Sequence, residues 1–304
     1  MYPYKDDLAF GTFVSEQVNT LRSSGVDVDV LFVNGRSSRL NYLIGILRLW
    51  RQLLKSRYDI IHAHYVYSGW IARMQWKLPV VVSFHGSEHR PGAAHELWLC
   101  RHIAPIVNAC TVTSIEHKGQ IGFDRSIIVP CGVDTELFRP EPRESARKKL
   151  GWSDDRQVML YVGADRPEKR LDIIRGANDI LQARRDDIEL VCVHGLNHAD
   201  VPVYLNAADV MVLASDSEGS PVCIKEAMAC NLPIVSTAVG DVPEMIDGIE
   251  GCYLCEQSSQ DMADKVELAL AYGKRTNGRE KALELSLEKI TERLISIYND
   301  CLQN

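Results

Sequence analysis

The chain has 304 residues, a formal net charge of -7, 46% hydrophobic residues and 25% charged residues. This length can form one large domain or two medium ones, and this balance is typical of a folded globular protein rather than a disordered one. No apolar run reaches the roughly 18 residues of a spanning helix, and residues 1–10 lack the pattern of a signal peptide. The nine cysteines are therefore expected to be reduced thiols in a cytoplasmic protein.

Apolar runs alternate with helical patterns along the chain, in two series. Strands are predicted first at residues 26–33, 59–63, 79–84, 109–113 and 127–129, and then at 158–162, 189–193, 210–213 and 233–236. Helices are predicted at residues 13–22, 40–54, 144–150, 171–183, 222–230 and 261–271, with one or two more within 280–302. Such alternation favours parallel sheets built from strand–helix–strand units. We therefore expect an α/β protein with two doubly wound, Rossmann-like domains.

The boundary between the two series falls where Pro140 and Pro142 interrupt the chain. We place one domain at residues 1–138, a second at 139–285 and a final helical segment at 286–304. A Rossmann-like domain normally opens with a buried strand that leads into a glycine-containing loop. Met1 to Lys5 already resemble a loop, and Gly11 opens the first helix, so the first strand is predicted to be missing.

A nine-residue stretch, EGSPVCIKE from Glu218 to Glu226, follows the predicted strand at 210–213. Ser220 is suited to the N-cap of a helix and Pro221 to its first position. The start of such a helix offers free N–H groups and a positive dipole end to a phosphate, and Gly219 lets a ligand approach the backbone. Glu226 is then placed for the hydroxyls of a ribose and Glu218 for those of a sugar. Either glutamate alone is more simply read as a surface residue.

Two further stretches also follow predicted strands. In YVGADRPEKR, Gly163 relieves the turn, and Lys169 lies near a helix start, where a cation is unfavourable unless a phosphate neutralises it. His85 follows the strand at 79–84, at the edge of the sheet where ligands of α/β proteins bind. Asp241 and Glu244 have the spacing of a capping box, which explains both structurally.

Several motifs of other chemistries are absent. The sequence has no P-loop and no nucleophile elbow. Cys252 and Cys255 form a single C-x-x-C with no second pair nearby, and Asp27 and Asp29 lie within a strand pattern, so we predict no metal. Any leaving diphosphate would then be neutralised by Lys169 and a helix N-terminus.

The predicted helix at 40–54 is nearly apolar all round and lies in a basic segment without acidic residues. The basic residues of this segment are Arg36, Arg39, Arg48, Arg51, Lys55 and Arg57. The helix either packs in the core or lies on anionic lipid. We favour core packing, with the arginines at the membrane surface, and expect no nucleic-acid partner because the basic charge is local.

The stretch EGSPVCIKEAMA at 218–229 resembles the E-x7-E signature of the retaining glycosyltransferases of family 4. VPCGVDTELFRP at 129–140 is similar to the family's interdomain sequence, and Pro167 to Lys169, SFHGS at 83–87 and Gly11 to Phe13 also match. The resemblance covers nearly the whole chain. It implies the GT-B fold, in which two Rossmann-like domains face each other across a cleft.

By this resemblance the first domain binds the acceptor, the second binds a nucleotide-diphosphate sugar, and the final helix packs back on the first domain. Lys169 would hold the diphosphate, Glu226 the ribose and Glu218 the sugar, while His85 would reach the sugar from across the cleft. The implied catalytic residues are His85, Lys169 and Glu218. The implied donor-binding residues are Gly11, Gly163, Arg166, Lys169, Glu218, Gly219, Ser220, Pro221, Val222 and Glu226.

The chain departs from the family pattern at a few positions. Ala164 stands where arginine is common, with Arg166 as a nearby substitute, Cys131 stands where asparagine is usual, and Asp241 replaces a common glycine.

We thus predict transfer of a hexose, with retention and without metal or cofactor, from a UDP or GDP sugar to a glycan or lipid-linked acceptor. The location is the cytoplasm, including the inner face of the membrane. Two alternatives stay open: a non-catalytic nucleotide-sugar-binding or partner subunit of the same fold, and a sugar-nucleotide epimerase.

Overall fold

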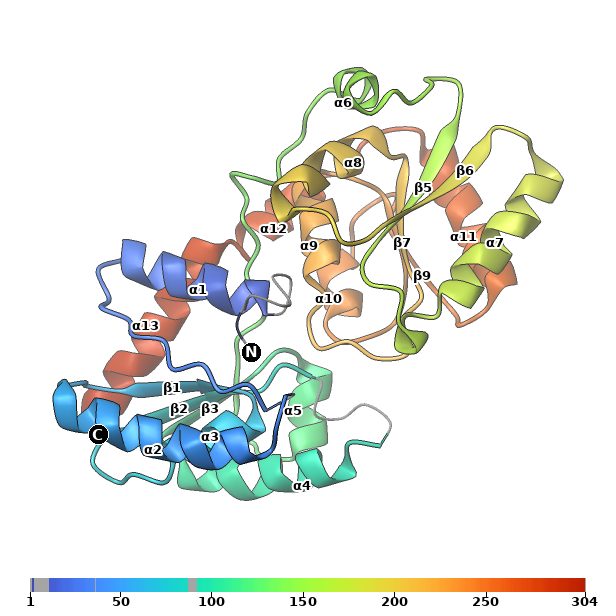
Figure 1. The fold of residues 1–304 in the computed structure, drawn as a ribbon. Helices are drawn as coiled ribbons and strands as arrows, with labels where there is room; N and C mark the ends of the chain where they lie inside the picture. The colour runs from blue at the N-terminus through green and yellow to red at the C-terminus, as the bar shows by residue number, and fades with distance from the viewer. Residues whose placement is uncertain (1, 3–10, 36, 87–91, 304) are drawn as a thin grey trace. The chain divides into compact units, whose positions relative to one another are not determined.

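The computed structural model describes residues 2, 11–35, 37–86 and 92–303 (Figure 1). It divides into two compact units, one formed by Met1–Gly132 with Leu287–Asn304 and the other by Val133–Ser286. The second unit begins earlier than residue 139, where the sequence placed it. The reason is that Val133 and Phe138 are already buried in the core of that unit, ahead of the two prolines.

The first unit contains a parallel sheet in the order β1-β2-β3-β4. Its strands are β1 (Ile61–His64), β2 (Val80–Ser83), β3 (Ala109–Val112) and β4 (Ile127–Ile128). All four predicted positions are confirmed to within two residues. Every residue of β2 is buried, as expected for a Val-rich strand in the middle of a parallel sheet.

The predicted strand at residues 26–33 is wrong. These residues form no strand and pair with no other described segment. A strand is stable only when a neighbour completes its ladder of hydrogen bonds, and hydrophobic pattern cannot supply one. The absence predicted for the first strand concerns residues 1–10, which, apart from Tyr2, lie outside the described residues.

Six helices accompany this sheet within the described residues. They are α1 (Thr12–Ser23), α2 (Leu40–Lys55), α3 (Val66–Ala72), α4 (Ala94–Ile103), α5 (Ile115–Ile121) and α13 (Leu287–Gln303). The sequence analysis missed α3, α4 and α5. Helix α13 is the final segment of the chain, and its Ile290, Leu294 and Ile297 share a core cluster with Val81 of β2. This places the end of the chain in the first unit.

Helix α2 corrects the expectation of core packing. Only Gly45 and Leu49 of this helix are buried. One apolar stripe is exposed instead, formed by Leu40, Leu43, Ile44, Leu47, Trp50 and Leu54. These positions recur every three or four residues, so they share one helix face. No described helix is both long and apolar enough to span a membrane.

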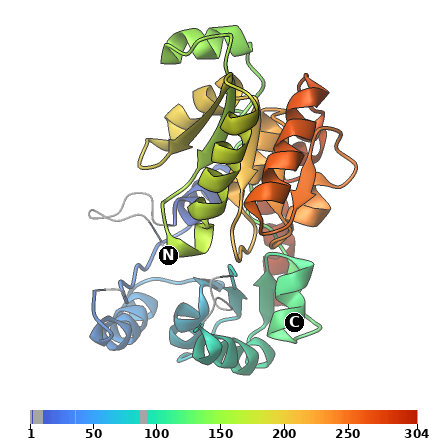
Figure 2. The same ribbon diagram turned by 90° about the vertical axis from the view of Figure 1, so that its right-hand side faces the viewer.

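The second unit contains a parallel sheet in the order β6-β5-β7-β8-β9. The strands are β5 (Gln157–Val162), β6 (Ile188–Val193), β7 (Val210–Leu213), β8 (Ile234–Thr237) and β9 (Tyr253–Cys255), of which β9 was not predicted. Helices cover both faces of the sheet (Figure 2). They are α6 (Arg143–Leu150), α7 (Leu171–Arg184), α8 (Val201–Ala207), α9 (Val222–Ala229), α10 (Val242–Ile246), α11 (Ser259–Tyr272) and α12 (Gly278–Leu283).

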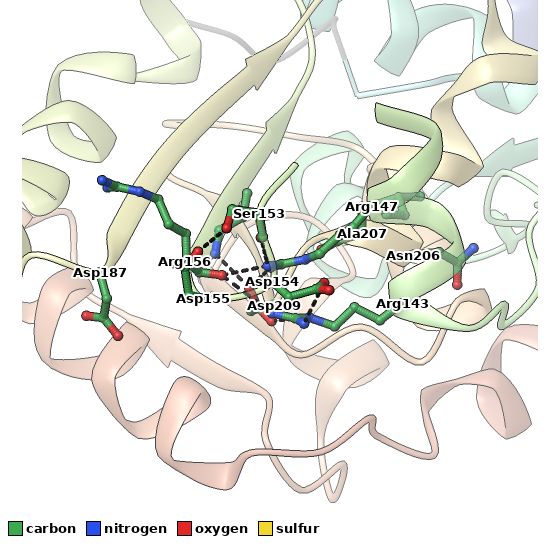
Figure 3. A network of polar contacts seen from close by, with 12 residues as sticks. Arg143, Arg147, Ser153, Asp154, Asp155, Arg156, Asp187, Asn206, Ala207 and Asp209 are labelled. Carbon is green, nitrogen blue, oxygen red and sulfur yellow. Dashed lines mark hydrogen bonds and ion pairs between the residues drawn. The ribbon is translucent and has the colours of Figure 1, made fainter. Parts of the chain in front are cut away.

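A buried arginine fixes α6 to this sheet (Figure 3). The side chain of Arg147 is fully buried and pairs with Asp209 at 2.6 Å. Its remaining N–H groups donate to the backbone carbonyls of Ser153, Arg156 and Ala207. A buried guanidinium is tolerated only when its donors are used in this way. The charged sequence of α6 therefore reflects an anchoring contact as well as a solvated surface.

Candidate functional site

The stretch from Glu218 to Glu226 lies on the loop and helix that follow β7. Thr237 of β8 holds the start of this loop by donating from Oγ1 to the carbonyl of Ser215 at 2.9 Å. Helix α9 begins at Val222, and its N-cap is Pro221, without a side-chain cap. The prediction that Ser220 caps the helix is therefore wrong. Pro221 therefore provides no side-chain hydrogen-bond acceptor for the first N–H groups of α9.

Lys169 and Glu218 meet in an ion pair. Lys169 ends a short 3-10 helix at Pro167–Lys169, and its Nζ lies 2.5 Å from Oε1 of Glu218. The same carboxylate oxygen accepts a hydrogen bond from Ser215 Oγ at 2.7 Å. Both charged side chains are largely buried, with 15% and 13% exposed. The structure thus brings together two predicted site residues that lie far apart in sequence.

Glu226 lies in the middle of α9 and has a partner that the sequence analysis missed. His198 Nε2 lies 2.6 Å from Glu226 Oε1, and the Glu226 side chain is only 6% exposed. The His198 ring packs against Phe138 at 5.1 Å between ring centroids. His198 lies in the segment after β6, 28 residues before Glu226 in the sequence. No local sequence pattern links the two residues.

A second contact that the sequence analysis missed joins Lys225 and Ser220 of this motif to Asp241, in the loop after β8. Lys225 is fully buried, and its Nζ lies 3.3 Å from Asp241 Oδ2 and also contacts Ser220 Oγ. Ser220 Oγ in turn donates to Asp241 Oδ2 at 2.5 Å. Burial raises the pKa of Asp241, while the Lys225 cation lowers it. Asp241 is the N-cap of α10 without a side-chain cap, so its predicted capping-box role is wrong.

The loop before α10 also contacts the motif. Gly240 has a φ of 58°, and a Cβ atom there would lie 2.6 Å from the carbonyl oxygen of Gly219. Only glycine fits such a close approach in the left-handed region without strain. The backbone of 218–219 therefore depends on this glycine.

Two further predicted donor residues, Gly163 and Arg166, lie near Lys169 in sequence. A Cβ atom on Gly163 would lie 2.8 Å from the Tyr161 hydroxyl. Arg166 is half exposed and pairs with Glu168 at 3.4 Å. Arg170 pairs with Asp216 at 3.2 Å, and the Asp216 N–H donates to the carbonyl of Glu168. These contacts join the loop after β5 to the loop after β7.

The described residues support neither a cysteine nucleophile in the motif nor a metal site. Burial raises the pKa of the Cys223 thiol to about 12, so it is protonated and a poor nucleophile at neutral pH. Within the part of the chain that the structure describes, no cluster of three His, Cys, Asp or Glu side chains could hold a metal ion.

His85 and Gly11 belong to the first unit. Gly11 is the N-cap of α1, with a φ of 71°. His85 Nε2 lies 3.0 Å from His64 Nδ1, and His62 bridges Tyr298 of α13 and Ser83 of β2 at 2.6 and 2.7 Å. Burial lowers the pKa of His85 to about 3 and that of His62 to about 4. These imidazoles are therefore neutral at pH 7.

Two family models match the chain. The model for Glycosyltransferase Family 4 matches residues 11–137, and the model for Glycosyl transferases group 1 matches residues 155–271. The chain belongs to glycosyltransferase family 4. It is thus a glycosyltransferase, and the group 1 match contains Gly163, Lys169, Glu218 and Glu226.

Relatives of this glycosyltransferase include two proteins named D-inositol 3-phosphate glycosyltransferase. That of Actinosynnema mirum is 27% identical over 84% of this chain and 76% of its own length. That of Geodermatophilus obscurus is 27% identical over 84% of this chain and 70% of its own length.

Solved structures show the same GT-B fold. Sucrose-phosphate synthase from Thermosynechococcus elongatus has a TM-score of 0.73 and 23% identity, covering 85% of this chain and 77% of its own. Anabaena HepE in complex with UDP-glucose has a TM-score of 0.69 and 16% identity, covering 92% of this chain and 87% of its own. The predicted fold class is confirmed.

Proposed function

We propose that this family 4 glycosyltransferase transfers a hexose from a nucleotide-diphosphate sugar to a glycan or lipid-linked acceptor, with retention and without a metal. The observation that carries the proposal is the ion pair of Lys169 and Glu218 beside the start of α9, with Glu226 further along the same helix.

Charge supports the assignment of the diphosphate to this place. Lys169 Nζ is held by a single carboxylate oxygen, and the first N–H groups of α9 lie a few residues beyond Glu218. A diphosphate brings negative charge that both the ammonium and the helix N-terminus stabilise. The stabilisation grows as the sugar leaves, because the diphosphate gains charge in the transition state.

The second unit also offers acceptors for hydroxyl groups. Glu218 and Glu226 are nearly buried carboxylates whose known partners are Lys169, Ser215 and His198. A carboxylate accepts strong hydrogen bonds from hydroxyls when it is shielded from water. We assign Glu226 to the ribose and Glu218 to the transferred sugar.

We propose retention from the resemblance to the retaining family 4 enzymes, and this motif offers no side chain suited to form a covalent intermediate on the way. The Cys223 thiol stays protonated, and Glu218 is neutralised by Lys169. We therefore propose that the acceptor oxygen attacks the anomeric carbon on the face from which the diphosphate departs. The bond between that carbon and the phosphate oxygen breaks, the bond to the acceptor oxygen forms, and the acceptor proton passes to the departing phosphate. His85, neutral at pH 7, would donate a hydrogen bond to the sugar.

Similarity favours UDP over GDP as the nucleotide. The Anabaena HepE structures hold UDP or UDP-glucose. UDP-glucose is accordingly the first donor to test, with GDP and ADP sugars beside it.

We further propose that α2 brings the enzyme to the inner face of an anionic membrane. Its exposed stripe includes Leu43 (60% exposed), Leu47 (70%) and Leu54 (84%). Arg48, Arg51 and Lys55 lie on the same helix, which has no acidic residue. Apolar side chains beside basic ones suit the boundary between lipid tails and anionic headgroups.

Donor turnover tests the catalytic proposal. The protein is incubated with UDP, GDP and ADP sugars, and release of the nucleotide is measured with and without EDTA. Lys169→Met is expected to lower kcat/KM by roughly a thousandfold, the usual scale for loss of a transition-state charge contact. Lys149→Met removes an exposed lysine of the same unit, 59% exposed, and is the matched control. Equal activity of both variants would refute the assignment of Lys169.

The same experiment separates the alternatives. NMR of the product reports whether the anomeric configuration is retained. Donor binding without turnover would indicate a binding subunit, and an epimerised donor without acceptor would indicate an epimerase. A requirement for a divalent cation would contradict the metal-independent mechanism.

Vesicle binding tests the membrane proposal. Cosedimentation with vesicles of equal phosphatidylglycerol and phosphatidylcholine is expected at low salt and is reduced by Leu47→Asp with Leu54→Asp. Leu268→Asp changes an exposed leucine of α11 (48% exposed) and is the control. Unchanged sedimentation of the double variant would exclude α2 as the contact.

A further inference from the structure

Three histidines lie close together where β1 and β2 end. His62 and His64 belong to β1 and are two residues apart, so their side chains lie on the same face of the sheet. His85 follows β2, two residues after Ser83, which is the register partner of His64. The pairing of two adjacent parallel strands thus brings the rings of His64 and His85 into contact from positions 21 residues apart.

The contact between His64 and His85 has the geometry of a hydrogen bond in the plane of both rings. His64 Nδ1 lies 3.0 Å from His85 Nε2. The ring centroids are 5.2 Å apart, and the ring planes differ by 13°. The centroid separation exceeds the distance between the nitrogens by about the sum of the two ring radii, so both nitrogens lie nearly on the line between the ring centres. An imidazole N–H and an imidazole lone pair both point along such a line.

His62 keeps the His64 ring in this position. Its ring packs against that of His64, with 4.3 Å between the centroids. Both ring nitrogens of His62 have partners, because Nδ1 lies 2.6 Å from Tyr298 Oη of α13 and Nε2 lies 2.7 Å from Ser83 Oγ. Ser83 Oγ in turn lies 2.6 Å from Thr111 Oγ1 of β3. The orientation of His64 is therefore set by side chains of β2, β3 and α13 as well as by its own strand.

One proton lies in the hydrogen bond between His64 and His85. Burial lowers the pKa of His85 to about 3 and holds the pKa of His64 well below its usual value, so both rings are neutral at pH 7. A neutral imidazole has one N–H and one lone pair. Either His64 Nδ1 donates to His85 Nε2, or His85 Nε2 donates to His64 Nδ1. The direction decides the tautomer of His85, because the hydrogen bond at one ring nitrogen determines which nitrogen carries the proton.

The two directions give His85 opposite chemistry at Nδ1. In the first, Nδ1 carries the proton and can donate a hydrogen bond to a hydroxyl oxygen. In the second, Nδ1 has a lone pair and can accept a proton as a general base. The proposed function requires the first direction, because His85 donates to the transferred sugar in that function and its Nε2 already lies against His64.

We propose that His64 is the positioning residue for His85: its Nδ1–H donates to His85 Nε2 and places the single proton of His85 on Nδ1. The proposal rests on the proposed function for the role of His85 toward the sugar, whereas the tautomer is a property of the first unit alone. With this tautomer His85 is a hydrogen-bond donor at Nδ1 and not a base. The acceptor proton therefore passes to the departing phosphate rather than to His85.

Nitrogen NMR of the full chain tests the tautomer in the absence of any substrate. The imidazole rings are labelled with ¹⁵N, and two-bond correlations between ring nitrogens and carbon-bound protons are recorded at pH 7. Their pattern shows which ring nitrogen of a neutral histidine carries the proton. The signals of His85 are identified by their loss in His85→Gln. We expect the pattern of a protonated Nδ1 and an unprotonated Nε2.

Two substitutions of His64 separate positioning from packing. His64→Asn keeps an N–H close to the position of Nδ1, and His64→Leu removes it. We expect His64→Leu to shift His85 away from the Nδ1–H tautomer and to lower kcat with UDP-glucose roughly tenfold, the scale of one lost hydrogen bond. His64→Asn should keep the tautomer and most of kcat. His117→Leu is the control and should leave the tautomer unchanged, because His117 is buried in the same unit and contacts Thr113 instead.

Three results would overturn the proposal. The first is an unprotonated Nδ1 on His85 in the unaltered chain, the second is an unchanged His85 pattern in His64→Leu, and the third is an equal change in His117→Leu. Failure of the proposed function has a different signature. It would appear as no turnover of any nucleotide sugar by a chain in which His85 shows the protonated Nδ1.

Discussion

Replacing Lys225 by methionine should destabilise the second unit strongly. The lysine is fully buried, and its partner Asp241 has only 12% of its side chain exposed. Removing one member of a buried pair leaves the other charge uncompensated, which typically costs about 3–5 kcal/mol. Asp241 keeps its hydrogen bond from Ser220, worth about 1 kcal/mol. We therefore expect Lys225→Met to lower the free energy of unfolding by about 3 kcal/mol.

Urea titration monitored by hydrogen exchange of β7 and α9 peptides measures this loss in the second unit alone. Burial already raises the pKa of Asp241, and removing the lysine cation raises it further. The variant should therefore lose less stability at pH 5 than at pH 8, because a protonated Asp241 needs no counter-charge.

The double variant Lys225→Met with Asp241→Asn supplies the decisive control. Asparagine removes the buried charge and can still accept the hydrogen bond from Ser220, so most of the lost stability should return. Lys149→Met removes an exposed ion pair of the same unit and should change stability by less than about 1 kcal/mol. A loss below about 1 kcal/mol for Lys225→Met, or no recovery in the double variant, would refute the reasoning.

Three further predictions concern the described contacts. Arg147→Met should cost about 3 kcal/mol in urea unfolding, because three carbonyls lose a donor and the largely buried Asp209 loses one of its partners. Gly240→Ala should cost more than about 1 kcal/mol and raise the KM for the donor, since its Cβ would meet Gly219 O. The folded-state pKa values of His62 and His85 lie below the unfolded value, so stability of the first unit should fall between pH 6.5 and 4. For His62 we expect the free energy of unfolding to be about 2 kcal/mol lower at pH 5 than at neutral pH. The unfolding midpoint measured as a function of pH should show this decrease, and His62→Gln should make the decrease smaller.

The sequence by itself determined the fold class and located most of the candidate site residues of the second unit. Strands β5, β7 and β8 are short apolar runs that are almost wholly buried, so their hydrophobic pattern is sufficient to locate them. The motif from Glu218 to Glu226 lies on one loop and one helix, so its residues are placed together by local geometry. Two helices were confirmed near the end of the chain, at Gly278–Leu283 and Leu287–Gln303.

Only the tertiary structure decided which side chains meet across distant segments. Lys225 and Asp241 are 16 positions apart, and His198 reaches Glu226 from another loop. A buried charge cannot be recognised from a helical pattern, because its partner belongs to a different element. The same reason applies to α2, whose apolar stripe is exposed, and to residues 26–33, which pair with no strand among the described residues. Hydrophobic pattern specifies what a segment can form, and the neighbours decide whether it forms and which face is covered.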